Sequence, residues 1–324
     1  MPVHFQLYQL MIRSLEELGY EIKLVFLTDN HFKYKNTKQR LASFIRKNIL
    51  QDKSYKRRLI FDTVNNELQY LLSNLDGVCD SALVIRPDLL SLDSLRLLKT
   101  RVKETIAYQW DGLSRFPDVF NRIPFFNKFF VFDQSDLKYS REFNNLYFIN
   151  NFYFQYPIQI NKKQKGKELV FIGSYLEHRM PAILHLMDVL HEQKIKNDIY
   201  LYCTDKKVLD RYKDSGIIFM QSTLSYQELL EKENDYQVII DFDNSEIHNG
   251  VSFRTFESLY LRKKLITNNP LIKQFEFYNS SNFFIWNEKN SNEILDFIRL
   301  PYKNIDDEVI SRYSFESWIN TVLG

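Results

Sequence analysis

The segment at residues 249–269 combines residue types that could bind a phosphorylated ligand. Loop-forming residues stand at its start, apolar residues then recur at helical spacing, and the apolar run 265–267 has the character of a short strand. The start of a helix presents free N–H groups and a positive dipole, and both favour an anion. Hydroxyl groups and one guanidinium, whose shape matches phosphate oxygens, accompany that start. The sequence therefore predicts a diphosphate site formed by Asn249, Gly250, Ser252, Arg254 and Thr255.

Glu257 lies one turn inside the same predicted helix. Its carboxylate could accept hydrogen bonds from a ribose diol, which would make the ligand a nucleotide. An ordinary capped helix with a surface arginine has the same residue spacing, so spacing alone leaves both interpretations open.

A second candidate phosphate contact follows the apolar run 169–172. Gly173 allows close approach of the backbone, Ser174 can donate a hydrogen bond, and Arg179 adds a positive charge. A plain tight turn would explain the Gly-Ser pair equally well.

Asp111 is the candidate catalytic residue. It follows a predicted strand within the sequence YQWDGLSRF, where partial desolvation beside Trp110 would strengthen the carboxylate as a general base. Arg115 is a candidate contact for an acceptor or a phosphate. The competing interpretation is an Asp-Gly turn, which is common in proteins.

Metal and redox chemistry have little support in the sequence. Asp241 and Asp243 form an Asp-x-Asp string, but a single such triplet at the end of a strand-like run arises often by chance. Cys79 and Cys203 have no neighbours that resemble a metal-ligand cluster or a redox pair. We therefore predict no metal site and no cofactor.

The segment 33–58 is strongly basic, with Asp52 as its one acidic residue. Apolar residues recur in it at helical spacing, a pattern typical of helices that lie on an anionic membrane surface. An ordinary helix that packs on a sheet and exposes a basic face has the same pattern. No aromatic stacking platform accompanies the charge, so the sequence does not indicate nucleic-acid binding.

Arg254 and Glu257, followed by the residues Leu-Ile-Thr-Asn at 265–268, resemble the donor-binding element of GT-B fold bacterial glycosyltransferases of the group 1 type, which build lipopolysaccharides and polysaccharides. The resemblance implies two Rossmann-like domains that face each other across a cleft. It also implies a nucleotide-sugar donor as substrate on the second domain, a cell-surface glycan or lipid-linked acceptor on the first, and catalysis without a metal ion. Gly173 and Ser174 would then face the donor diphosphate.

The retaining members of this family carry a Glu-x7-Glu motif, whose second Glu matches Glu257. The first position of the motif holds Asn249, so that part is absent, and we predict an inverting transfer with Asp111 as the base. The rival hypotheses are a catalytically inactive sugar-nucleotide-binding or structural protein and a non-sugar phosphotransferase of the same fold.

Composition and patterning describe an α/β protein that can position these residues. The chain has 324 residues, 44% hydrophobic and 26% charged, with a net charge of +2, values typical of a folded protein with two domain cores. Strands are predicted at 23–27, 82–86, 105–109, 128–132 and 146–149, then at 169–172, 199–202, 217–220, 238–241 and 283–286. Helices are predicted between them, including 56–75, 181–193, 206–214 and 226–233. This alternation favours mostly parallel sheets with ligands at the carboxyl ends of the strands.

The polar residues 155–167 lack apolar periodicity and are the predicted linker between an acceptor domain, 1–155, and a donor domain, 156–324. A helix at the start of the chain precedes the strand at 23–27, whereas a Rossmann domain normally opens with a strand, so we expect either that the first strand of the N-terminal domain is missing or that the domain has an unusual edge. No apolar run is long enough to span a membrane, and no signal-peptide pattern is present. We therefore expect a cytoplasmic protein that is peripheral on the inner face of the cytoplasmic membrane if the basic segment binds lipid.

Overall fold

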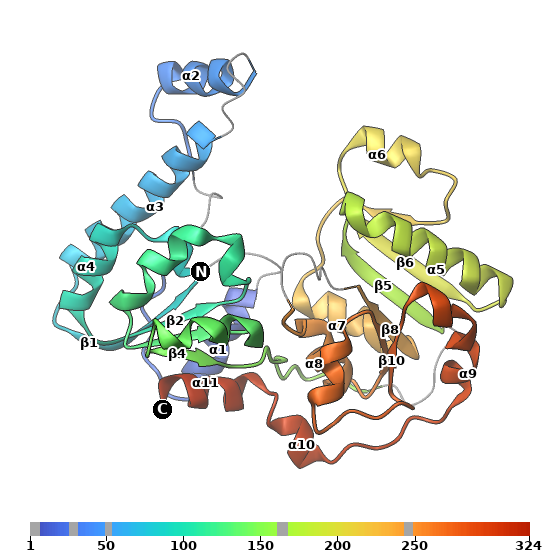
Figure 1. Cartoon of the computed structure of the whole chain (residues 1–324). Helices are drawn as coiled ribbons and strands as arrows, with labels where there is room; N and C mark the ends of the chain where they lie inside the picture. Colours follow the sequence, from blue (N-terminus) through green and yellow to red (C-terminus); the bar gives the residue numbers. More distant parts are fainter. Residues whose placement is uncertain (1–6, 26–31, 49–53, 161–167, 243–248) are drawn as a thin grey trace. The chain divides into compact units, whose positions relative to one another are not determined.

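The computed structural model describes residues 7–25, 32–48, 54–160, 168–242 and 249–324. The chain divides into two compact units, unit 1 (Met1–Ile149) and unit 2 (Asn150–Val322) (Figure 1). The division falls slightly before the expected boundary at 155/156. Residues 151–154 belong to unit 2 because Tyr153 exchanges main-chain hydrogen bonds of 3.0 and 2.8 Å with Tyr313 and Phe315 near the C-terminus.

Unit 1 is built on a parallel sheet. Its described strands, which lie in the order β1-β2-β3-β4, are β1 (Cys79–Ile85), β2 (Val102–Gln109), β3 (Lys128–Val131) and β4 (Leu146–Phe148). Its described α-helices are α1 (Leu7–Glu17), α2 (Thr37–Asn48), α3 (Ser54–Ser73) and α4 (Leu92–Arg101). The core joins apolar positions of α3 and α4 to alternate residues of the strands, such as Ala107, Phe129 and Val131.

The strand predicted at 23–27 is wrong over residues 23–25, which have no regular structure; residues 26 and 27 lie outside the described residues. The other four strands predicted in this half are confirmed as β1 to β4. The predicted linker has no helix or strand over residues 155–160, and residues 161–167 lie outside the described part.

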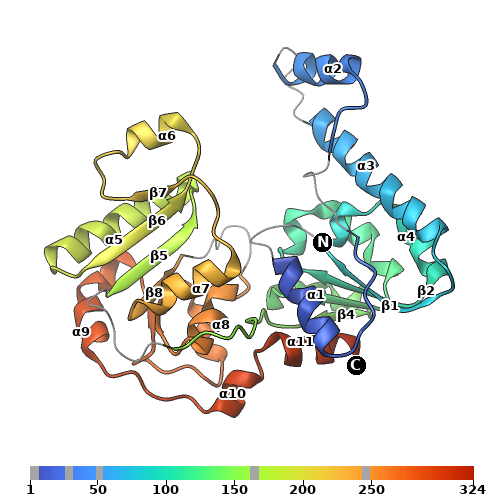
Figure 2. The ribbon, with the colours of Figure 1, turned by 180° about the vertical axis from the view of Figure 1, so that it is seen from behind.

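Unit 2 is a doubly wound α/β unit. Its described strands, in the spatial order β10-β9-β8-β5-β6-β7 and all parallel, are β5 (Leu169–Ser174), β6 (Asn197–Tyr202), β7 (Ile218–Met220), β8 (Val238–Asp241), β9 (Lys264–Thr267) and β10 (Phe283–Ile285). The described α-helices of unit 2 are α5 (Met180–Glu192), α6 (Lys206–Arg211), α7 (Tyr226–Asn234), α8 (Phe253–Tyr260), α9 (Ile294–Arg299), α10 (Asp307–Ser311) and α11 (Phe315–Leu323). Figure 2 shows the same elements from behind.

The strand order of unit 2 is that of a dinucleotide-binding Rossmann sheet. From β5 the chain moves to β6 and β7 on one side, and then returns to β8, β9 and β10 on the other. The direction of winding reverses between β5 and β8, and ligands of such sheets bind at the carboxyl ends of the strands beside this switch point. The ends of β5 and β8 are therefore where a ligand site is expected.

Two consecutive buried lysines tie helices to this sheet. Lys263 donates through Nζ to the main-chain oxygen of Asn234 at 2.7 Å, at the end of α7. Lys264 donates through Nζ to the oxygens of Phe297, Ile298 and Leu300 at the end of α9. Each ammonium group satisfies carbonyls that the last turn of a helix leaves without partners.

No helix in the described part of the chain is both long and apolar enough to cross a membrane.

Candidate functional site

Arg254 occupies the switch point of unit 2. It lies in the first turn of α8, whose apolar residues Phe256 and Leu259 are buried against the sheet. Its guanidinium forms ion pairs through Nη1 with Asp241 at 3.2 Å and through Nε with Glu233 at 3.3 Å. Its Nη2 donates to the main-chain oxygen of Ile172 in β5. One side chain therefore links α8, the end of β8, α7 and β5.

Three carboxyl groups surround this arginine, and two of them have strongly raised pKa values. Burial, opposed by the charge of Arg254, raises the pKa of Glu233 to about 7. Burial, followed by the charge of Glu233, raises the pKa of Glu257 to about 8. Asp241 is also buried, with 4% of its surface exposed. The carboxyl groups of Glu233 and Glu257 therefore bind protons near neutral pH, and the guanidinium of Arg254 supplies one permanent positive charge.

The N-terminus of α8 lacks a side-chain cap. Ser252 stands at the N-cap position, but its hydroxyl donates to Asp241 Oδ2 and does not accept from the helix. Among the described residues, the Ser252 side chain therefore supplies no capping oxygen to the first turn of α8, and the start of a helix favours an anion.

Two asparagines hold the loop that leads into α8. Asn269 Nδ2, after β9, donates to the main-chain oxygen of Gly250 at 3.2 Å, and Asn151 Nδ2 donates to that of Val251 at 2.9 Å. These bonds occupy the loop carbonyls, so the helix start keeps one orientation relative to the sheet.

The structure brings most of the predicted donor residues to this edge of the sheet. Gly173 and Ser174 end β5, beside the carbonyl that Arg254 contacts. Arg179 lies further along the chain, at the N-cap of α5. Thr255 and Glu257 are buried, with 1% and 5% of their surface exposed, so both face the interior of unit 2. Asn249 is exposed at the start of the loop.

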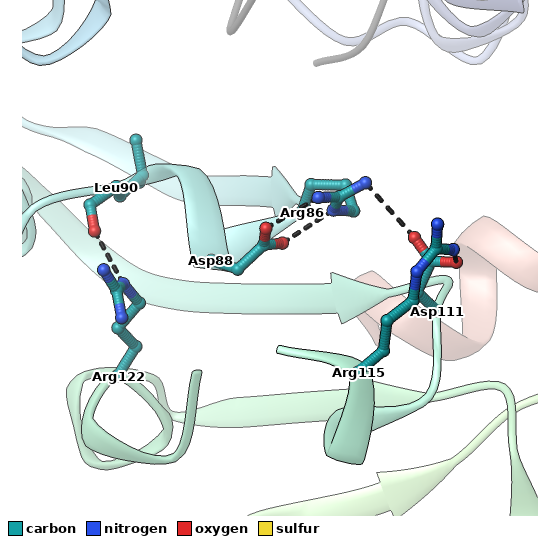
Figure 3. Close-up of polar contacts among 6 residues, drawn as sticks. All are labelled: Arg86, Asp88, Leu90, Asp111, Arg115 and Arg122. Atoms are coloured by element: carbon teal, nitrogen blue, oxygen red, sulfur yellow. Dashed lines mark hydrogen bonds and ion pairs between the residues drawn. The ribbon is translucent and has the colours of Figure 1, made fainter. Parts of the chain in front are cut away.

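The carboxyl edge of the sheet in unit 1 carries a second charged cluster (Figure 3). Asp111 follows β2 and is paired through Oδ1 with Arg115 Nη1 at 2.6 Å and through Oδ2 with Arg86 Nη1 at 3.2 Å. Arg86 also makes a two-pronged ion pair with Asp88, at 2.6 and 2.7 Å, and lies 4.3 Å from the ring centre of Phe116. The predicted base is therefore held between two guanidinium groups.

The backbone at Arg86 is strained. Its φ of 64° lies in the left-handed region, which costs a non-glycine residue about 1–2 kcal/mol. The ion pairs with Asp88 and Asp111 hold the side chain in place across the ends of β1 and β2. Backbone strain of this kind is found where a side chain must be fixed at a functional site. In the same view Arg122 is turned away and donates to the main-chain oxygen of Leu90 at 2.7 Å.

Gln109, the last residue of β2 and two positions before Asp111, is fully buried. Within the described residues, neither polar atom of its side-chain amide has a hydrogen-bond partner. A buried amide without a partner costs about 1–3 kcal/mol, so such a group is a reason to expect a water molecule or a ligand.

Sequence reasoning missed Glu233 and Arg86. The signal for Glu233 was present, because it follows the apolar positions of Leu229 and Leu230 at helical spacing and so lies on the buried face of α7. Arg86 stands directly before a proline at the end of a strand, which marks a turn but does not show what the side chain contacts.

Asp243 of the Asp-x-Asp string lies outside the described residues. Among the residues described, no group of three or more His, Cys, Asp or Glu side chains could hold a metal ion.

No family model and no curated protein matches the sequence. Solved structures are similar in fold. The pneumococcal O-GlcNAc transferase GtfA, in complex with UDP and GlcNAc, has a TM-score of 0.52 at 12% identity over 80% of this chain and 59% of that chain. HepE of Anabaena, in complex with UDP and glucose, has a TM-score of 0.50 at 11% identity over 80% of each chain.

These similarities establish the fold. The chain has the GT-B architecture, in which each of two units is Rossmann-like, and this confirms the fold that the sequence resemblance implied. The chain spans 59% of the length of GtfA and 56% of the length of accessory secretory protein chains from Streptococcus pneumoniae, which it matches at a TM-score of 0.49.

Proposed function

We propose that this chain is a glycosyltransferase that moves a sugar from a nucleotide-sugar donor to a cell-surface glycan or lipid-linked acceptor. The observation that supports this best is Arg254 at the switch point of unit 2, beside the uncapped N-terminus of α8. GtfA and HepE, the two structures compared above, were both solved with UDP. A nucleoside diphosphate is thus the ligand class that this edge of unit 2 would take.

In this proposal the donor binds to unit 2. Its diphosphate lies at the first turn of α8, with Arg254 as the counter-charge and with Gly173, Ser174 and Arg179 as further contacts. Arg254 has 17% of its side chain exposed and keeps N–H groups beyond the three that contact Glu233, Asp241 and Ile172. A positive helix end and a guanidinium stabilise the leaving diphosphate, so the proposal requires no metal ion or cofactor.

The acceptor binds to unit 1, where Asp111 acts as the base. It takes the proton from the acceptor hydroxyl as that oxygen attacks the anomeric carbon and the nucleoside diphosphate leaves, which inverts the configuration. Arg115 has 45% of its side chain exposed, so an acceptor can displace it from Asp111, whereas Arg86 remains to orient the carboxylate. The buried amide of Gln109 is a further group that an acceptor or its water could satisfy.

The proposal places the enzyme in the cytoplasm, peripheral to the inner face of the membrane through the segment 33–58. Anionic lipid is the complementary surface for that basic segment.

The test is a panel of nucleotide sugars, with release of nucleoside diphosphate measured in the presence and absence of acceptors, alongside calorimetry with UDP. Turnover that Arg254→Ala weakens would support the proposal. UDP affinity without turnover on any donor would favour the rival hypothesis of an inactive sugar-nucleotide-binding protein. No affinity for any nucleotide would refute the donor site itself.

A further inference from the structure

Helix α2 exposes its apolar residues. Leu41, Phe44 and Ile45 have 59%, 62% and 37% of their surface exposed. They are spaced three and four residues apart, so they form one stripe along the helix, which we call the α2 stripe. A helix that packs on a protein core would bury such a stripe.

The opposite side of α2 is the side that contacts the rest of unit 1. Ser43 is buried and its hydroxyl accepts a hydrogen bond from Tyr34 Oη at 3.0 Å. The guanidinium of Arg46 lies 4.6 Å from the ring centre of Tyr55, at the start of α3. Polar groups therefore face inwards, and the α2 stripe faces outwards. Helix α2 itself lies at the end of α3 that is away from the sheet (Figures 1 and 2).

Positive charge borders the stripe on both sides. At 3.6 residues per turn, Arg40 and Lys47 flank it on one side and Lys38 flanks it on the other. Residues 32–48 and 54–61 contain no Asp or Glu. The basic residues of these two ranges are Lys33, Lys35, Lys38, Arg40, Arg46, Lys47, Lys56, Arg57 and Arg58.

The exposed apolar pair Tyr70 and Leu71 on α3 lacks this setting. They have 71% and 46% of their surface exposed, but they lie near Glu67 and no cation flanks them on the helix. The combination of an outward apolar stripe with basic flanks therefore distinguishes α2 from α3.

We propose that α2 docks in the interface of an anionic lipid bilayer, with the α2 stripe among the acyl chains and Lys38, Arg40 and Lys47 at the headgroups. Charge complementarity favours the bilayer as the binding partner, because the apolar stripe matches the acyl chains and the flanking cations match the anionic headgroups. The inference goes beyond simple attraction of the segment 33–58 to lipid, since it requires insertion of three named side chains. Because α2 and Asp111 belong to the same unit, it also favours a lipid-linked acceptor over a soluble glycan, and that consequence rests on the proposed function.

The experiment uses the full chain and vesicles of phosphatidylcholine with or without phosphatidylglycerol. The variant Leu41→Ser/Phe44→Ser/Ile45→Ser removes the stripe, Lys38→Glu/Arg40→Glu/Lys47→Glu removes the flanking charge, and Tyr70→Ser/Leu71→Ser is a matched control on α3. Circular dichroism establishes that each variant is folded. A further variant, Leu41→Trp, reports insertion as a blue shift of its fluorescence relative to the wild-type chain.

We expect binding that needs phosphatidylglycerol, that weakens with salt, and that falls at least about tenfold when the stripe is removed, which corresponds to about 1.4 kcal/mol. The α3 control should bind as the wild type does, and the fluorescence of Leu41→Trp should shift to the blue.

Binding that survives loss of the stripe but not of the charge would overturn insertion. If the chain does not bind vesicles, α2 does not dock on a membrane. If the wild type forms a concentration-dependent dimer that the stripe variant does not form, the stripe binds a second copy of the chain and not lipid. Donor hydrolysis without vesicles is measured in parallel, so failure of docking is distinguishable from failure of the proposed enzyme activity.

Discussion

Arg254 in α8 donates a hydrogen bond to the main-chain oxygen of Ile172 in β5, although the two residues are 82 positions apart in the sequence. The same guanidinium is paired with Asp241 at the end of β8. The two strands on either side of the switch point are thus joined by one cation at the place where a Rossmann sheet binds its ligand.

The first prediction concerns this cation. Arg254→Ala should destabilise the folded chain by about 3–5 kcal/mol, because Glu233 and Asp241 lose their counter-charge in a buried setting. Urea unfolding measures this loss, and calorimetry should also show weaker UDP binding by about 1.5–3 kcal/mol. The double variant Arg254→Ala/Glu233→Gln should recover part of the stability at alkaline pH, where Glu233 would otherwise ionise without its counter-charge. Equal stability of the single and double variants at alkaline pH would contradict the ion pair with Glu233.

The second prediction is a pH dependence of stability. The pKa of Glu233, about 7, and that of Glu257, about 8, lie above the value of 4.5 that these groups have when exposed. Between pH 4.5 and these values the folded chain binds more protons than the unfolded chain, so the free energy of unfolding should fall as pH rises. The slope is at most about 1.4 kcal/mol per pH unit for each group.

Unfolding by urea at a series of pH values from about 5 to 8 checks this. Glu257→Gln should flatten the slope, whereas Glu228→Gln, an exposed glutamate on α7, should leave it unchanged. A slope that is the same in the wild type and in Glu257→Gln would show that Glu257 is ionised throughout this range.

The third prediction concerns Lys264. Lys264→Met should cost about 1–3 kcal/mol at pH 7, because the carbonyls at the end of α9 lose their donor. Lys99→Met, an exposed lysine on α4, is the matched control and should change stability little.

The same lysine predicts the opposite pH trend on the alkaline side. Burial lowers the pKa of Lys264 to about 8, below its unfolded value of 10.5, so the unfolded chain binds more protons between these values. Stability of the wild type relative to Lys264→Met should therefore rise from pH 8 towards about 9.5. Differential unfolding of the two proteins measures the trend, and a constant difference would mean that the ammonium group stays charged.

The fourth prediction concerns Asp111. Asp111→Asn should reduce turnover by at least about a hundredfold, since a positioned base contributes about two to four orders of magnitude. UDP affinity should be unchanged, because the donor residues belong to unit 2. Asp118→Asn, an exposed carboxylate nearby in the sequence, is the control and should retain turnover. Near-full activity of Asp111→Asn, or a product that keeps the anomeric configuration of the donor, would mean that Asp111 only pairs with Arg86 and Arg115.

Apart from the strand expected at 23–27, the sequence by itself determined the strands of both units. The strand predicted at 238–241 is β8 with the same limits, and loop chemistry followed by helical spacing indicated a helix start near 251–253, where α8 begins at Phe253. These signals are local, since burial on one face of a helix or strand leaves a short-range pattern. The resemblance at Arg254 and Glu257 then led correctly to the GT-B fold.

Only the tertiary structure decided which charges meet. Glu233 and Arg254 come from different helices, and Arg86 and Asp111 from different strand ends, so their pairing depends on the order of strands in each sheet. Residues 23–25 of the strand expected at 23–27 form no strand. A segment of strand-forming residues becomes a strand only where it can hydrogen-bond to a neighbouring strand, and the sequence does not show where that neighbour lies. The outward direction of Leu41 and Phe44 was equally undetermined, since an amphipathic pattern defines a face but not what that face contacts.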